Sequence, residues 1–308
     1  CWFAYPFADG LKLSMRGSDQ DDCIIQGAGA LMQFTHPYLQ KTYFGNPCSP
    51  GPGLLILYIP FVWLHLYILG AISAIAAVSY LLARRWQEWS TVGLWLTTLL
   101  CSLVVPEALV VGSDLILPAC LILAIALLLG SSIEKQDYFL LVILAIATGL
   151  IASMRINFIV FAPLVALFIF VRWRVGAVLF LFISLATTLV PGYFIYQLDP
   201  TSFTPLHLVS KSAKFIPMGF LICTGLASIC IALYCAYRLK RGGSNFPLAI
   251  FLSLAPMLLV TSIGELAYGQ WNIAGWAGAN YLIPLLPLAA YLLIDITQDP
   301  QTYQAARD

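Results

Sequence analysis

The sequence predicts an all-α fold, a polytopic transmembrane helical bundle with about nine spans and a short helical outer loop. Hydrophobic residues make up 61% of the 308 residues and charged residues only 9%, whereas a soluble domain carries roughly 25% charged residues. So few charges cannot build a surface exposed to water. Because the apolar residues also gather in long runs with short connections between them, lipid is expected to cover most of the molecule.

The spans are predicted at the apolar runs. The first run, 54–83, is too long for one straight helix and contains Pro60, so we expect a short interfacial helix followed by a span, with one net crossing. Residues 1–53 then form the outer loop, residues 54–296 the transmembrane bundle and residues 297–308 a cytoplasmic tail. The expected crossings are 54–83, 91–111, 115–132, 138–154, 157–171, 175–196, 216–237, 246–264 and 276–295.

Basic residues divide the connections into two sets, one with nine of them and one with six. The nine cluster at helix ends, where the positive-inside bias acts, so this set is expected to face the cytoplasm. The protein is then a multi-pass protein of the plasma (inner) membrane, with residues 1–53 outside. The inner set is Arg84, Arg85, Lys135, Arg172, Arg174, Arg238, Lys240, Arg241 and Arg307; the outer set is Lys12, Arg16, Lys41, Arg155, Lys211 and Lys214.

The first residue, the cysteines and the basic residues add further expectations. The chain begins with Cys1 and has no charged-then-apolar signal before it, so we expect a fragment that lacks its first transmembrane helix. Cys23 and Cys48 share a polar segment and could form a disulfide, whereas cysteines in apolar runs behave as small hydrophobic residues. No cysteine spacing resembles a zinc site, and no basic patch with interleaved aromatic residues indicates nucleic acid binding.

The densest acidic cluster is Asp19, Asp21 and Asp22. It precedes a stretch, 23–34, that is expected to form a short helix. One interpretation is helix capping, because Ser18 with an acid three residues later approximates a capping box and acids in a first turn complement the helix dipole. The other is a site: in a helix that begins at Ser18, Asp19 and Asp22 share a face and could hold a hydroxyl or a divalent metal ion.

The segment 35–53 is rich in Pro, Gly and aromatic residues, which indicates a stiff connector rather than a helix. It carries His36, Tyr38 and Lys41. Such a segment suits the wall of a site on the membrane face. An interfacial anchor is the alternative, because Tyr and Trp favour that depth.

Arg155 stands between two apolar runs, where a cation normally faces a cavity or a partner. It could bind an anion or extend to the lipid headgroups. Asp114, at the second outer turn, could supply a further carboxylate or act as a polar stop at a helix end. His65, in the first run, is expected to be a satisfied buried histidine. Further candidates for an anionic headgroup are His207, Lys211 and Lys214, which could equally be solvated loop residues.

Together these residues resemble the GT-C-type membrane glycosyltransferases, a superfamily that includes protein O-mannosyltransferases and aminoarabinose transferases. The resemblance rests on the acidic cluster, the short helix, the step His36-Pro37-Tyr38 and the run Ser49-Pro50-Gly51-Pro52-Gly53. It is sharpest over 17–60, weaker at 112–114 and 153–163, and elsewhere extends only to the layout of spans. Gln20 follows Asp19 where the family often has Glu, and Thr35 precedes the aromatic-Pro step where it often has Gly.

The resemblance implies that a carboxylate of the first outer loop is the catalytic base, here Asp19 with Asp21 and Asp22 as neighbours. The implied reaction moves a sugar, with inversion, from a polyprenyl-phosphate carrier to a glycan, lipid or protein acceptor on the outer face. Because phosphate leaves as a stable anion, one base and cations that hold the phosphate suffice. The expected substrate-binding residues are Arg155, Lys41, Tyr38, His36, Asp114, His207, Lys211 and Lys214, and a metal ion, if used, would bind Asp19 and Asp22.

Two other classes of protein remain open. A multi-span transporter or flippase would place ionisable groups near the bilayer midplane on broken helices and often shows internal repeats. Here the acids concentrate in one outer loop, and no repeat is visible. A non-catalytic scaffold protein would have no cavity that joins the first outer loop to the membrane.

Overall fold

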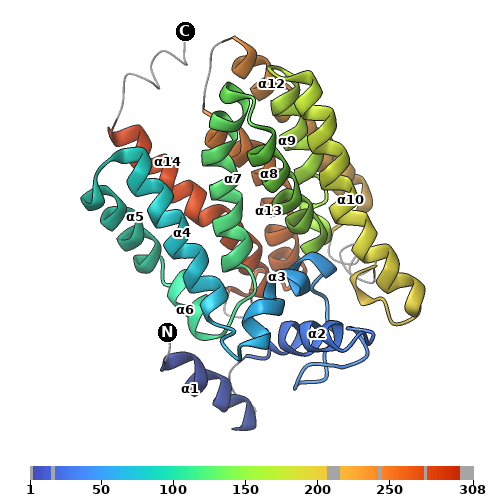
Figure 1. Cartoon of the computed structure of the whole chain (residues 1–308). Coiled ribbons are helices and arrows are strands. Elements are labelled where there is room, and N and C mark those ends of the chain that lie inside the picture. Colours follow the sequence, from blue (N-terminus) through green and yellow to red (C-terminus); the bar gives the residue numbers. More distant parts are fainter. Residues whose placement is uncertain (1–2, 15–17, 207–215, 242–244, 274–275, 299–308) are drawn as a thin grey trace.

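The computed structural model describes residues 3–14, 18–206, 216–241, 245–273 and 276–298 (Figure 1). Within these residues the chain is helical and forms no strand, which confirms the all-α prediction. One isolated β-bridge joins Lys41 and Pro47 in the outer loop.

The segment before the bundle forms three short helical elements at the lower end of the molecule in Figure 1. They are α1 (Ala4–Gly10), the 3-10 helix η1 (Leu11–Ser14) and α2 (Asp22–Met32). The predicted short helix after the acidic cluster is therefore confirmed as α2. It lies against the first helix of the bundle, where Gly27 faces the side chain of Leu55.

Each predicted crossing contains at least one helix. The bundle consists of α3 (Pro52–Trp63), α4 (Leu69–Trp86), α5 (Trp89–Cys101), α6 (Val104–Val110), α7 (Ile116–Lys135), α8 (Tyr138–Met154), α9 (Phe161–Phe170), α10 (Arg174–Leu198), α12 (Met218–Lys240), α13 (Phe246–Tyr268) and α14 (Leu286–Gln298). Three 3-10 helices complete it: η2 (Ile156–Phe158), η3 (Thr204–Leu206) and η5 (Ala277–Leu285).

Five helical segments among the described residues are long and apolar enough to cross a membrane: α7, α10, α12, α13 and the segment Gly278–Thr297. The pair α5 and α6, bent by 76°, would make a sixth. α3, α8 and α9 are apolar but shorter; the 10 residues of α9 rise only about 15 Å. The structure thus supports an integral membrane protein, with five or six crossings by length and composition.

The first apolar run divides as the sequence predicted, into the short α3 and the longer α4. The division falls at Leu64–Ile68 and not at Pro60, which lies inside α3. His65 stands in this break with a φ of 56° and is exposed. The prediction that His65 is buried was wrong, because the run is not one continuous helix at this point.

The connections gather at two opposite ends of the bundle (Figure 1). Those that follow α4, α7, α9 and α12 lie at the upper end. Two hydrogen bonds join elements there, the end of α4 to α14 and the connection after α9 to the end of α12. Trp86 donates to Asp295 at 3.4 Å, and Arg172 donates to the Leu239 carbonyl at 2.9 Å. The described basic residues of the predicted cytoplasmic set therefore share one end, opposite the outer loop.

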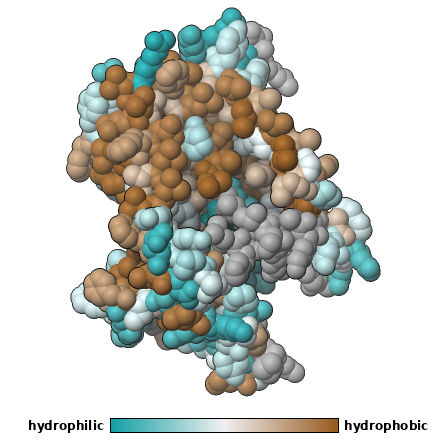
Figure 2. All heavy atoms as spheres, turned by 90° about the vertical axis from the view of Figure 1, so that its right-hand side faces the viewer, coloured by the Kyte–Doolittle hydropathy of each residue, from teal (hydrophilic) through white to brown (hydrophobic). Residues whose placement is uncertain are grey.

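Large apolar side chains point outward from α10 and α12, among them Phe182, Leu189 and Phe220. Figure 2 shows apolar residues over much of the face that it presents on the bundle, with polar residues at the upper end and towards the outer-loop end. This distribution is the one that lipid contact requires. Inside the bundle, small residues allow close packing: Gly149 of α8 lies directly against the backbone of Ser184 in α10.

The start of α3 lies unusually close to the end of α8. The Gly51 amide donates to the Met154 carbonyl at 2.6 Å. A Cβ at Gly51 would stand 1.8 Å from the Ser153 oxygen, and one at Gly53 would stand 2.1 Å from the Leu150 oxygen. These contacts are to backbone atoms, which cannot turn aside, so only glycine fits at either position.

We therefore expect Gly53→Ala to lower the free energy of unfolding by about 1–3 kcal/mol, the range for overpacked sites. Thermal unfolding in detergent measures the change. The control is Gly93→Ala in α5, where a Cβ would meet no atom within 4 Å. Equal unfolding temperatures for the two variants would contradict the close packing of α3 on α8.

Candidate functional site

Lys12 lies at the centre of the acidic cluster. Its ammonium group forms ion pairs with Asp9, with Asp21 at 3.3 Å and with Asp22 at 2.5 Å. Oxygen atoms of these three carboxylates lie within 4.8 Å of one another, an arrangement that could hold a metal ion. The ammonium group of Lys12 already supplies a positive charge there, which reduces the repulsion among the three carboxylates.

Asp21 is the most buried of these acids, with 1% of its surface exposed. It accepts hydrogen bonds from the Tyr5 hydroxyl and from Lys12. Burial raises the pKa of the Asp21 carboxyl to about 6, against the opposing effects of Tyr5 and Lys12. Asp21 is therefore a structural carboxylate that joins α1 and η1 to the start of α2.

The predicted capping box was wrong, because the N-cap residue of α2, Asp21, makes no side-chain cap hydrogen bond; an acid, Asp22, does lie in the first turn. The start at Ser18, on which the shared helix face of Asp19 and Asp22 depended, was also wrong, because α2 begins at Asp22. The Ser18 hydroxyl instead accepts from the Gln20 amide at 3.2 Å. The competing partners Tyr5 and Lys12 draw the Asp21 carboxylate away from the helix end.

The carboxylates of Asp19 and Asp22 both accept hydrogen bonds from backbone amides of the loop that follows α2. The Asp22 carboxylate accepts from the Tyr43 amide at 2.7 Å, and the Asp19 carboxylate accepts from the Phe44 amide at 3.3 Å. Asp19 is not part of the group of acids that could bind a metal, so the structure gathers Asp9, Asp21 and Asp22 rather than the predicted pair. Among the described residues, the Phe44 amide is the one hydrogen-bond donor to the Asp19 carboxylate.

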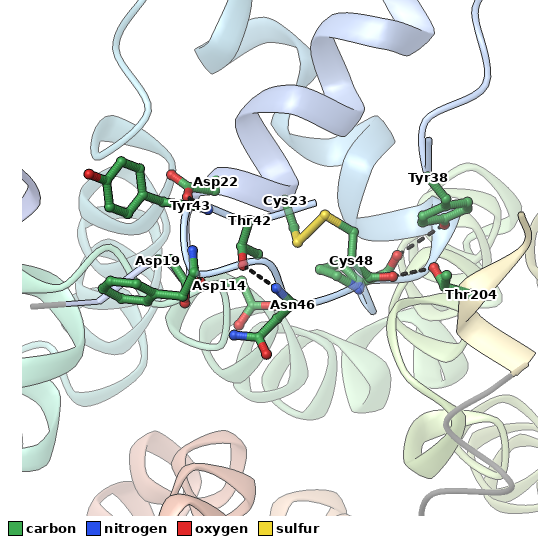
Figure 3. The surroundings of a disulfide bond; sticks show 12 residues. Asp19, Asp22, Cys23, Tyr38, Thr42, Tyr43, Asn46, Cys48, Asp114 and Thr204 are labelled. Carbon is green, nitrogen blue, oxygen red and sulfur yellow. Dashed lines mark hydrogen bonds between the residues drawn. A yellow bond between two sulfur atoms is a disulfide. The ribbon is translucent and has the colours of Figure 1, made fainter. Parts of the chain in front are cut away.

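The connector after α2 is tied down along its length (Figure 3). A disulfide joins Cys23 to Cys48, as the sequence allowed. The buried Tyr38 donates to the Pro50 carbonyl at 3.0 Å, and Thr204 donates to the Cys48 carbonyl. The connector is therefore packed against the segment that follows α10. A segment held in this way could form the wall of a site.

His36 and Lys41 lie in the same connector with different surroundings. His36 is buried and accepts a hydrogen bond from the Tyr38 amide at 3.4 Å through Nδ1. Lys41 is exposed, and its bridge to Pro47 is made by the backbone. His36 and Tyr38 thus serve the packing of the connector, and Lys41 remains accessible to a ligand.

Arg155 and Asp114 form an ion pair of 2.6 Å at the outer-loop end of the bundle. Asp114, in the turn before α7, is 2% exposed. Arg155 follows α8 in an extended conformation, and its Nε is buried with no hydrogen-bond partner among the described residues. One edge of the guanidinium is thus held by a carboxylate while Nε is left to donate to something else.

Arg155 lines a cavity of about 870 Å³, which we call the arginine cavity. Among the described residues that line it, Arg155 is the one with a charged side chain, and most of the others are apolar. The walls come from the start of α3, the end of α8, the outer half of α10 and the segment after it. They include Pro52, Met154, Ile159, Leu189, Val190, Gly192, Tyr193, Phe194, Phe203 and Pro205.

The structure brings together some predicted site residues and separates others. Asp114 and Arg155 pair directly, and Asp19, Asp22 and Asp114 are drawn around the same disulfide in Figure 3. None of the aspartates is among the described residues that line the arginine cavity. His207, Lys211 and Lys214 lie outside the described residues.

Sequence reasoning missed the roles of Tyr5, Asp9 and Lys12. Asp9 and Lys12 stand three residues apart, a spacing that suits an ion pair on a helical segment. That spacing was the available signal. The contact of Tyr5 with Asp21, 16 residues later, leaves no local trace in the sequence.

Comparison with other proteins gives no family assignment. No protein-family model, no curated protein and no solved structure matches this chain.

Replacing Lys12 by Met should lower stability by about 3 kcal/mol or more, because it leaves buried carboxylates without their cation. The loss should be larger at pH 8 than at pH 5. The pKa of Asp21 is already raised to about 6, and without Lys12 it rises further. Protonation in the folded state then relieves the penalty as pH falls towards the unfolded-state pKa of about 3.9.

Thermal unfolding of the Lys12→Met variant at the two pH values measures this effect. Lys135→Met, at the opposite end of the bundle, is the control. A loss of stability that is the same at pH 5 and pH 8 would contradict the role given to Lys12.

Proposed function

We propose that the chain is a membrane glycosyltransferase that moves a sugar from a polyprenyl-phosphate carrier to an acceptor at the outer face of the membrane. The observation that carries this proposal is the arginine cavity. It combines apolar walls with one cation whose Nε has no partner among the described residues. A long apolar chain that ends in a phosphate matches both features.

In this proposal Arg155 binds the phosphate of the carrier. A guanidinium presents several N–H donors in a fixed plane, which suits the oxygens of a phosphate. Asp114 holds one edge of this plane through Nη2, so Nε keeps its direction before the ligand arrives. The polyprenyl chain then lies along Leu189, Val190 and Phe194 of α10, where burial of apolar surface favours binding.

Asp19 is the proposed base. Asp21 and Asp22 are both paired with Lys12, and the Asp22 carboxylate also accepts a hydrogen bond from the Tyr43 amide. Asp19 is partly exposed, and among the described residues its carboxylate accepts one hydrogen bond, of 3.3 Å. It is therefore the carboxylate of the cluster best able to accept a proton from an acceptor.

The proposed reaction is a single displacement. The acceptor oxygen attacks the anomeric carbon of the sugar, and its proton passes to Asp19. The bond between that carbon and the phosphate oxygen breaks, and its electron pair leaves with the phosphate, which Arg155 holds. The configuration at the anomeric carbon is inverted. Lys41, His207, Lys211 and Lys214 remain candidates for further contacts to the donor headgroup.

The proposed topology is the nine-crossing arrangement, with residues 1–53 on the outer side of the plasma (inner) membrane. The grouping of the basic connections at the opposite end supports it, because basic residues favour the cytoplasmic side. The disulfide between Cys23 and Cys48 supports the same orientation, since disulfides persist in oxidising compartments.

Arg155→Ala should weaken the binding of undecaprenyl phosphate by about 10- to 100-fold, because a hydrogen bond to a charged group contributes about 1.5–3 kcal/mol. Gly192→Phe should weaken it too. Gly192 lines the arginine cavity, and a Cβ there meets no atom within 4 Å, so the ring has room to occupy the cavity. Binding is measured with the protein in nanodiscs.

The matched control for the second variant is Gly219→Phe on α12, an exposed position where a Cβ also meets no atom within 4 Å. It should bind undecaprenyl phosphate as the wild-type protein does. Wild-type affinity in both Arg155→Ala and Gly192→Phe would remove the arginine cavity from the proposal.

Asp19→Asn should reduce sugar transfer by about 10²- to 10⁴-fold, the usual contribution of a general base, while undecaprenyl phosphate still binds. Transfer is followed with radiolabelled polyprenyl-phosphate sugars and a membrane extract. Asp137→Asn is the control, because Asp137 caps α8 at the opposite end and Asn caps helices equally well. Full transfer by Asp19→Asn would exclude Asp19 as the base.

A further inference from the structure

A second cavity, of about 500 Å³, lies between the N-terminal segment and the corner where α3 meets α4. We call it the tyrosine cavity, because Tyr5 and Tyr67 form part of its wall. It shares no lining residue with the arginine cavity. The other residues that line it are Pro6, Ile25, Gly29, Met32, Val62, Trp63, His65, Leu66 and Ile68.

Helix α2 presents a different face to each side. Ile25, Gly29 and Met32, spaced by four and three residues, face the tyrosine cavity. Cys23 and Gly27 face the connector and α3 instead. Contacts on the opposite face of α2 therefore hold in place the residues that line the cavity.

The hydroxyl groups of the two tyrosines already donate hydrogen bonds within the protein, so they do not donate to a ligand in the cavity. The Tyr5 hydroxyl donates to Asp21, and the Tyr67 hydroxyl donates to the Gly112 carbonyl at 2.9 Å. Their rings stack with centroids 5.9 Å apart. Apart from the His65 imidazole, what remains for a ligand is mainly ring faces and aliphatic side chains, which favour an apolar ligand over a free sugar.

The surroundings of the cavity are also apolar. Phe3 and Phe7 of the N-terminal segment are 89% and 73% exposed, and Trp63, which lines the cavity, is 69% exposed. Exposed aromatic residues at the end of a membrane bundle are typical of the lipid interface. The molecules that meet this surface at the highest concentration are then membrane lipids.

The cavity also adjoins the acidic cluster. The Tyr5 ring lines the cavity while its hydroxyl holds Asp21. Gly112, with a φ of 68°, lies against both residues, since a Cβ there would stand 2.7 Å from Tyr5 and 3.1 Å from Asp21. Two residues later the same turn reaches Asp114, the partner of Arg155. This short turn thus contacts one lining residue of each cavity, Tyr5 through Gly112 and Arg155 through Asp114.

We propose that the tyrosine cavity binds the apolar chain of a lipid, and that this lipid is the acceptor of the transferred sugar. The acceptor role rests on the proposed function; the binding of a lipid chain does not. Two separate cavities give the carrier and the acceptor each a place for its chain, and both headgroups then meet at the outer-loop end of the bundle.

Gly29→Phe tests this inference, because Gly29 lines the cavity and a Cβ there meets no atom within 4 Å. The matched control is Gly93→Phe, an exposed position on α5 where a Cβ also meets no atom within 4 Å. Each protein is placed in phosphatidylcholine vesicles that contain phosphatidylglycerol with a photoreactive acyl chain, and adducts are located by mass spectrometry. Wild-type protein and the control should carry adducts on Val62 and Leu66, and Gly29→Phe should lose them.

Unchanged labelling of Val62 and Leu66 in Gly29→Phe, or labelling of the wild-type protein no stronger than that of the lipid-facing Phe182, would overturn the inference. Sugar transfer to the lipid fraction of the extract is measured in parallel. Loss of adducts without any transfer by wild-type protein would reject the glycosyltransferase and keep the lipid site. Transfer only to protein, or undiminished transfer to lipid by Gly29→Phe, would reject the lipid acceptor and keep the enzyme.

Discussion

The ion pair between Arg155 and Asp114 fixes the outer-loop end of this membrane protein. It joins the end of α8 to the turn before α7, and the amide of Gly51 holds the α8 backbone one residue before Arg155. Breaking a buried pair by removing one partner costs about 3–5 kcal/mol, since it leaves a charge uncompensated. Arg155 is therefore kept at the cavity wall, and its Nε can meet a ligand without first reordering the side chain.

A second group of charges, around Lys12, organises the segment in front of the bundle. The helices α1 and α2 have 7 and 11 residues, lengths at which an isolated helix is not stable in water. Contacts from Lys12 and Tyr5 to the acidic cluster, together with the disulfide to Cys48, join these short elements into one layer. This layer lies over the end of the bundle and forms one wall of the tyrosine cavity.

The helical bundle was predictable because its signal is local: a run of apolar residues makes a helix wherever it is placed in lipid. A break in the first apolar run was predicted, but its position at residues 64–68, which exposes His65, was not, since that position depends on how α3 and α4 pack. The start of α2 at Asp22 was missed because Tyr5 and Lys12 compete for the acid that would cap an earlier start. The sequence indicated Asp114 and Arg155 separately as site residues. Their pairing was not predictable, because it joins positions 41 residues apart and leaves no local sequence pattern.

A structure of the protein bound to undecaprenyl phosphate in nanodiscs, determined by electron cryomicroscopy, tests the central claim most directly. The account predicts a phosphate oxygen about 2.7–2.9 Å from Nε of Arg155, with the polyprenyl chain against Val190 and Phe194 and the pair with Asp114 intact. A phosphate bound at the opposite end of the bundle, beside Arg84 or Arg238, or a carrier chain outside the arginine cavity, would contradict it.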